Sequence, residues 1–306
     1  MNKIKFLIKL SITIFLFYII FAYYIDFDEF IKVFQNINIF YVIIACLLWP
    51  VGIFLSSFKW YLILKQYDIN ISLKESFNLY WIASFFNNFL PSSIGGDGYK
   101  FLYLNKKIEN KKAQIMSSMI LERGLGFVAL NIFIIIFSIS FLPILYTNNI
   151  IIFYIIIFLI ISILGFFIFL LLNKKSIKNE FKNKLLNKFV KLINILITFK
   201  NKKVLFFGFL ISFIFVLNSI IGQYLLFGSL GNNVDLSLIS FVYPIVNIVG
   251  IIPISINSLG VTESFSIYMY GIFGVNAEIV LASAILGRVL MILLSATGGI
   301  RYLFWK

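Results

Sequence analysis

The sequence predicts an all-α polytopic membrane protein, with about six full transmembrane helices and two opposed re-entrant helical hairpins. Three observations lead to this fold class. The 306 residues are 61% hydrophobic, with a mean hydropathy of +1.01, whereas soluble domains are about 45–50% apolar. Ile- and Phe-rich runs of span length recur without the alternation of an outer-membrane barrel. Two further runs are interrupted by proline, serine and glycine.

Six apolar runs are long enough to cross a bilayer core, which takes about 20 helical residues. They cover residues 6–25, 39–64, 113–142, 150–172, 204–230 and 277–299, with an outer turn expected at 143–149. Basic residues accumulate on the cytoplasmic side of membrane proteins. Lysines before the first run and Arg301 and Lys306 at the other end therefore place both termini in the cytoplasm. By the same rule, Lys59 and Lys65 mark the cytoplasmic end of the second span.

The first interrupted run, residues 77–104, carries Asn-Phe-Leu-Pro-Ser-Ser-Ile-Gly-Gly-Asp-Gly at positions 88–98. Pro91 lacks a backbone N–H, and the glycines favour backbone angles that other residues avoid. Lysines flank both ends, so both ends are expected on the cytoplasmic side. About 28 residues cannot cross twice at 1.5 Å per residue. The sequence therefore predicts a re-entrant hairpin with its tip at 91–98; an ordinary interfacial loop is the alternative.

The second interrupted run, residues 236–273, breaks at Pro253-Ile-Ser-Ile-Asn-Ser-Leu-Gly260 and continues into Glu263. No Lys or Arg occurs between Lys203 and Arg288, so its flanks look external. We expect a second hairpin that enters from outside. Broken backbone at membrane depth is tolerated where protein buries it or where it lines an aqueous cavity, and such breaks are pointers to a transporter site.

The two halves of the chain share an order of elements. Ser-Met-Ile-Leu-Glu-Arg at 118–123 matches Ser-Ala-Ile-Leu-Gly-Arg at 283–288 in four of six positions. A proline-initiated break precedes each, and the charge pattern gives the halves opposite orientation. We therefore predict one membrane domain over 1–306, built from an inverted repeat at 35–145 and 204–303.

The segment 173–203 holds ten lysines and one acid, with apolar residues at helical spacing between 181 and 197. It is expected to be an amphipathic helix on the cytoplasmic surface, or else a solvated linker. The net charge of +14 indicates contact with anionic lipid headgroups rather than nucleic acid, because the lysines lie beside the spans.

Candidate binding residues lie at the two breaks and on the spans that follow them. They are Pro91, Ser92, Gly95, Gly96, Asp97, Lys100, Glu122, Arg123, Pro253, Ser255, Asn257, Gly260, Glu263 and Arg288. Ionisable residues inside a membrane usually face a bundle interior or a cavity. We expect Arg123, Arg288 and Lys100 to hold a phosphate, since guanidinium binds it in a bidentate fashion. Helix starts at Gly98 and Gly260 would add N–H donors. The alternative is a set of structural ion pairs.

Other chemistries have little support. The chain has no histidine and a single cysteine, Cys46, which leaves no His-based catalysis, no His metal site and no internal disulfide. The stretch 95–100 lacks the G-x-x-x-x-G-K-[ST] pattern of a P-loop. We expect no catalytic residue, metal or cofactor.

These motifs resemble the lysylphosphatidylglycerol synthase transmembrane family, also called flippase-like membrane proteins. The resemblance runs over about residues 35–300 and rests on Asn88 to Pro91, the glycines with Asp97, Glu122-Arg123, Pro253 to Ser255, Gly260, Glu263 and Gly274. Lys100 and Ser258-Leu259-Gly260 depart from the family pattern. The resemblance implies a lipid flippase module. The soluble aminoacyl-transferase that some members carry is not expected, since the chain ends at Lys306.

The sequence thus favours an inner-membrane translocase for a phosphate-bearing lipid: a phospholipid, an aminoacyl-phospholipid or a polyprenyl-phosphate lipid. The alternative is a membrane subunit that scaffolds a lipid- or glycan-modifying enzyme without transport. An integral membrane glycosyltransferase using Asp97 and Glu122 ranks third. Lipid identity, direction, energy source and oligomeric state are left open.

Overall fold

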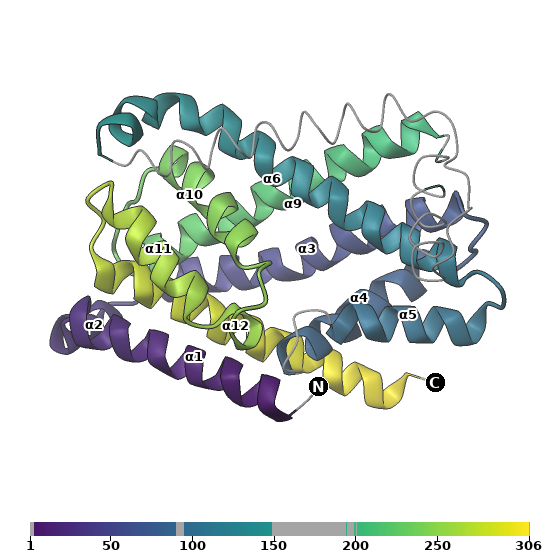
Figure 1. Ribbon diagram of the computed structural model, residues 1–306, viewed down its shortest axis with the longest axis horizontal. Coiled ribbons are helices and arrows are strands. Elements are labelled where there is room, and N and C mark those ends of the chain that lie inside the picture. The colour runs from purple at the N-terminus through teal and green to yellow at the C-terminus, as the bar shows by residue number, and fades with distance from the viewer. Residues whose placement is uncertain (1–2, 90–94, 149–193, 195–198, 200, 306) are drawn as a thin grey trace.

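The computed structural model describes residues 3–89, 95–148, 194, 199 and 201–305, and the elements in these ranges are helices (Figure 1). Four of them are long and apolar enough to cross a membrane: α3 (Ile39–Lys65), α6 (Lys112–Asn148), α9 (Lys202–Ser229) and α12 (Ala277–Phe304). A fifth candidate combines α1 (Lys3–Tyr23) with α2 (Phe27–Gln35), which are bent by 92°. The predicted class, an all-helical multi-pass membrane protein, is confirmed in these ranges. The predicted span 150–172 and nearly all of 173–203 lie outside them.

Both interrupted runs form helical hairpins. The first consists of α4 (Leu73–Phe89) and α5 (Gly95–Lys107), and the second of α10 (Leu236–Val249), the 3₁₀ turn η1 (Ile256–Ser258) and α11 (Val261–Gly271). Their α-helices have 11 to 17 residues, fewer than the about 20 that a full crossing requires. The hairpins lie toward opposite ends of the long axis (Figure 1). Re-entry from opposite membrane faces, as the sequence predicts, stays a prediction.

Helices α3 and α9 pack side by side and run antiparallel. At one end, Asn38 N donates to Ser229 O at 2.8 Å; at the other, Asn201 Nδ2 donates to Gln66 Oε1 at 2.9 Å. Beside this pair, one helix of each hairpin packs against a long helix from the other half of the chain. Helix α4 packs against α12, and α10 packs against α6. Each half therefore packs a hairpin helix against the Arg-bearing helix of the other half. The inverted repeat itself stays a prediction.

Three local expectations are wrong. The outer turn predicted to begin at Pro143 is still helix, because α6 continues to Asn148. The first break ends earlier than Gly98, because α5 begins at Gly95. Glycine at 96 allows this close turn: a Cβ there would lie 2.2 Å from the carbonyl oxygen of Ala83 on α4. Lys59 does not mark a membrane surface, because it is only 4% exposed.

Candidate functional site

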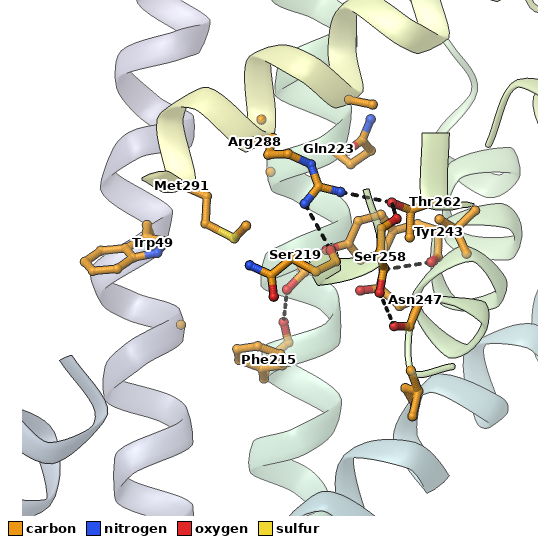
Figure 2. Close-up of a pocket in the computed structure, with 18 of the residues that line it drawn as sticks. Trp49, Phe215, Ser219, Gln223, Tyr243, Asn247, Ser258, Thr262, Arg288 and Met291 are labelled. Carbon is orange, nitrogen blue, oxygen red and sulfur yellow. Dashed lines mark hydrogen bonds between the residues drawn. The ribbon is translucent and has the colours of Figure 1, made fainter. Parts of the chain in front are cut away.

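A cavity of about 1140 Å³ lies between α3, α9 and α12, with both hairpins contributing to its wall. Most of the lining side chains are apolar, among them Trp49 on α3 and Met291 on α12 (Figure 2). The polar lining is concentrated on α9, α10 and the hairpin tips. Figure 2 shows Arg288 of α12 pointing toward Thr262 of α11. The cavity is thus an apolar chamber with a polar region.

One ionic group on the wall belongs to the first half of the chain. Arg123 of α6 pairs with Asp97 in the first turn of α5; its Nε lies 2.6 Å from Asp97 Oδ2. Lys100 Nζ lies 3.0 Å from the other oxygen, Oδ1. Asp97 therefore forms salt bridges with two cations, Arg123 and Lys100. The Arg123 side chain is 55% exposed, and no described residue accepts a hydrogen bond from its Nη1 atom.

The second half supplies an equivalent pair. Arg288 donates to Glu263 Oε1 from Nη2 at 2.6 Å and from Nε at 3.0 Å, and Nη2 also donates to Thr262 Oγ1 at 3.0 Å. Glu263 Oε2 accepts from the Gly260 N–H at 2.7 Å. The side chains of Arg288 and Glu263 are 21% and 3% exposed. In both halves, the acid in the third position of a short helix pairs with an arginine on the next long helix. The two residues are 26 positions apart in the first half and 25 in the second.

The hairpin tips meet each other. Asn257 Nδ2 donates to the carbonyl oxygens of Asn87 and Asn88, at 2.9 and 3.2 Å. Asn87 Oδ1 in turn accepts from the Gly96 N–H at 2.8 Å. Asn257 has a φ of 51°, a left-handed conformation that asparagine tolerates better than most residues. Gly260 (φ +82°) allows α1 to approach, because a Cβ there would lie 2.8 Å from Leu16 Cβ.

Lys100 lies away from the cavity. It is 3% exposed, and its Nζ lies 3.8 Å from the ring centroid of Tyr80 and 4.9 Å from that of Trp60. These rings and Asp97 satisfy its charge. Lys100 is therefore not placed to contact a phosphate in the cavity, as the sequence led us to expect. It neutralises Asp97 instead.

Glu122 also turns away from the main cavity, toward Lys59 of α3. Lys59 Nζ lies 2.9 Å from Glu122 Oε1, and it donates to Ser212 Oγ at 3.0 Å and to the Glu122 carbonyl oxygen at 3.2 Å. Three helices, α3, α6 and α9, are joined at this point. Sequence reasoning missed Lys59 as an interior residue. Its signal was a lysine inside an apolar run, ahead of the run's end.

The structure sorts the sequence candidates into three groups. The main cavity is lined by Asp97, Arg123, Pro253, Asn257, Glu263 and Arg288. Beside it but off its wall lie Gly95, Gly96, Lys100, Glu122, Ser255 and Gly260. Pro91 and Ser92 are outside the described residues. Sequence reasoning missed further polar wall residues, namely Asn218, Ser219, Gln223, Tyr243, Asn247 and Thr262; amides inside apolar helices were the available signal.

The described helices offer no cluster of three Cys, Asp or Glu side chains that could hold a metal ion. The two arginines on the cavity wall, Arg123 and Arg288, are instead groups that can bind an anion. Guanidinium groups held by carboxylates present their remaining donors in a fixed plane, which suits phosphate oxygens.

Comparison with known proteins gives concordant matches over nearly the whole chain. A family described as Lysylphosphatidylglycerol synthase TM region matches residues 6–299. A UPF0104 membrane protein of Methanocaldococcus jannaschii is 28% identical over 288 residues, 86% of this chain and 84% of the relative. A UPF0104 membrane protein of Methanothermobacter thermautotrophicus is 22% identical over 293 residues, 84% of this chain and 83% of that protein.

Proposed function

Because this chain belongs to the family of the lysylphosphatidylglycerol synthase TM region, we propose that it moves a phosphate-bearing lipid between the leaflets of the inner membrane. The observation that carries the proposal is the sharing of Asp97 by two cations. Lys100 and Arg123 both pair with it, so this group has one positive charge in excess. Arg123 is the exposed member, and it faces the cavity.

The excess charge calls for an anion. An uncompensated charge at the centre of a membrane helix costs at least about 2.5–3.5 kcal/mol on insertion scales. The other interior pairs, Lys59 with Glu122 and Arg288 with Glu263, are each neutral. A phosphate on the free Nη1 of Arg123 would neutralise the excess and gain a charge-assisted hydrogen bond.

The apolar part of the cavity suits the rest of a lipid. Its lining includes Cys46, Leu48 and Trp49 on α3 and Met291 and Leu294 on α12. A headgroup held at Arg123 would leave the first acyl carbons against this wall and the tails in the bilayer. A soluble phosphate metabolite would have no use for so large an apolar surface.

We place both termini in the cytoplasm, following the positive-inside rule. Helices α1 and α12 run in opposite directions along the long axis (Figure 1), and Asp26 N donates to Glu278 Oε1 at 3.2 Å where α1 has ended and α12 begins. The two chain ends therefore point toward the same end of the molecule, which is consistent with both termini lying on one side of the membrane.

A reconstitution experiment tests the proposal. Purified protein in liposomes receives acyl-chain-labelled lipids, and an impermeant reductant bleaches only the outer leaflet. We expect bleaching beyond the outer-leaflet fraction for phosphate-bearing lipids, and its loss in Arg123→Gln. Arg301→Gln, on the exposed last turn of α12, is the matched control. Movement by Arg123→Gln at the control rate would contradict the proposal. No movement by the unmodified protein, together with a copurifying enzyme, would favour the scaffold.

A further inference from the structure

We infer that the lipid headgroup is bulky, hydroxyl-rich and uncharged beyond its phosphate, and that this distal part occupies a second cavity behind Arg123. The inference rests on the proposed function, because it names the substrate class of the same site. It follows from the presence of this second cavity, which a phosphate bound to Arg123 would not fill.

The second cavity has a volume of about 590 Å³. Ligand pockets span about 300–1,000 Å³, so it is far larger than a packing defect. Six residues line both cavities: Arg123, Phe215, Ser219, Tyr243, Asn247 and Ile251. The two chambers therefore adjoin at Arg123. A phosphate on that guanidinium would lie at their junction, with the tails on one side and the rest of the headgroup on the other.

The charges in the second cavity disfavour a cationic distal group. All three N–H donors of Lys59 are used, by both the carboxylate and the carbonyl of Glu122 and by Ser212. The Lys59 and Glu122 side chains are 5% and 12% exposed. Glu122 is thus already neutralised, while Arg123 and Lys59 would both repel an incoming ammonium. A second anionic group would face the carboxylate of Glu122.

Most of the uncharged lining of the second cavity is apolar, and its polar members, which lie at the junction, suit hydroxyl groups. Ser219, Tyr243 and Asn247 present hydroxyl and amide groups at the junction, and these can both donate and accept. Ser219 Oγ is positioned by its bond to Phe215 O at 3.0 Å, and Asn247 Nδ2 by its bond to Tyr243 O at 2.9 Å. A polyol or a sugar can satisfy such a surface, because each of its hydroxyls also does both.

Gly126 keeps this chamber open. A Cβ at Gly126 would meet only the Nζ of Lys59, at 3.9 Å, which is ordinary contact. Because Gly126 lines the second cavity, a leucine there is expected to take up part of its volume. Leucine also favours helix over glycine by about 0.8–1 kcal/mol, so this replacement in α6 fills the chamber without weakening the helix.

The experiment measures leaflet exchange for a headgroup series in liposomes. The acyl-labelled probes are phosphatidic acid, phosphatidylglycerol, phosphatidylinositol, a glycosyl-phosphate lipid and the zwitterionic phosphatidylethanolamine, whose distal group is a cationic ammonium. The variants are Gly126→Ala, Gly126→Leu and, as the control, Gly271→Leu. A Cβ at Gly271 would have nothing within 4 Å, so a side chain there is equally free of steric clash, but Gly271 lines neither cavity. Thermal unfolding in detergent verifies that each variant is folded.

For the unmodified protein we expect the hydroxyl-rich probes to exchange faster than phosphatidylethanolamine. In Gly126→Leu their exchange should fall at least about tenfold, equal to about 1.4 kcal/mol, while phosphatidic acid is spared and Gly126→Ala lies between. Whether the glycerol or the sugar probe falls further identifies the source of the hydroxyls. Equal loss for all probes, no loss, or fastest exchange of phosphatidylethanolamine would overturn the inference while leaving lipid movement standing. Movement of no probe by the unmodified protein would overturn the proposed function itself, and the inference with it.

Discussion

The two arginines should differ in what their loss does to folding, although the sequence presents them as equivalent. In Arg123→Gln, Asp97 keeps Lys100 at 3.0 Å, so the remaining pair is neutral. In Arg288→Gln, Glu263 is 3% exposed and has no other cation within salt-bridge distance among the described residues. Glutamine is used because it retains a polar side chain of similar length without the charge.

The magnitudes follow from exposure. Arg123 is 55% exposed, and exposed ion pairs are worth about 0–1 kcal/mol. Removing one partner of a buried pair costs about 3–5 kcal/mol. The unfolding free energies of the two variants should therefore differ by at least about 2 kcal/mol, with Arg288→Gln the less stable.

Thermal unfolding in detergent, followed by the loss of monodisperse protein, measures this difference. A difference of that size lowers the melting temperature by about 2 °C per kcal/mol in a large domain. The double variant Arg288→Gln with Glu263→Gln should recover most of the loss, because no buried charge is left unpaired. Equal melting temperatures for the two single variants, or no recovery in the double variant, would refute the reasoning. Transport should fall in both arginine variants.

Three further tests address the cavity, the hairpin contact and the topology. Gly98→Leu should stop lipid movement without loss of stability, because Gly98 lines the main cavity with nothing within 4 Å of its Cβ; Gly271→Leu is the control, and equal transport in both would contradict the cavity's role. Asn257→Asp should destabilise the protein by about 1–3 kcal/mol, since a carboxylate cannot donate to the tip carbonyls; an unchanged melting temperature would argue against this contact. In a Cys46→Ser background, Asn148→Cys should react with an impermeant thiol reagent from outside and Lys178→Cys only from inside; the reverse pattern would overturn the proposed topology.

Much of the helical architecture could be predicted from the apolar composition and from the two interruptions of the apolar runs. Long apolar runs predict spans, because only helices and closed barrels satisfy backbone polar groups in lipid. Four such runs became α3, α6, α9 and α12, with starts close to the expected ones, while α6 and α12 continue beyond their expected ends. Both hairpins were predicted, since proline, serine and glycine clustered within a few residues disfavour a continuous helix. The helical continuation through Pro143 was missed, because packing overrode the local signal of the proline.

The sequence by itself identified most of the residues that carry the interior charge, although not Lys59. It contains Asp97, Arg123, Glu263 and Arg288 in a repeated order, and a charge inside lipid must find a partner. Tertiary structure alone decided the partners and the exposures. Lys59, which charge counting placed at the membrane surface, pairs with Glu122 because the α3–α6–α9 packing brings them within 2.9 Å. The unequal environments of the two arginines also come from packing, since a charge's cost depends on the neighbours and water around it, and these are set by segments far away in the chain.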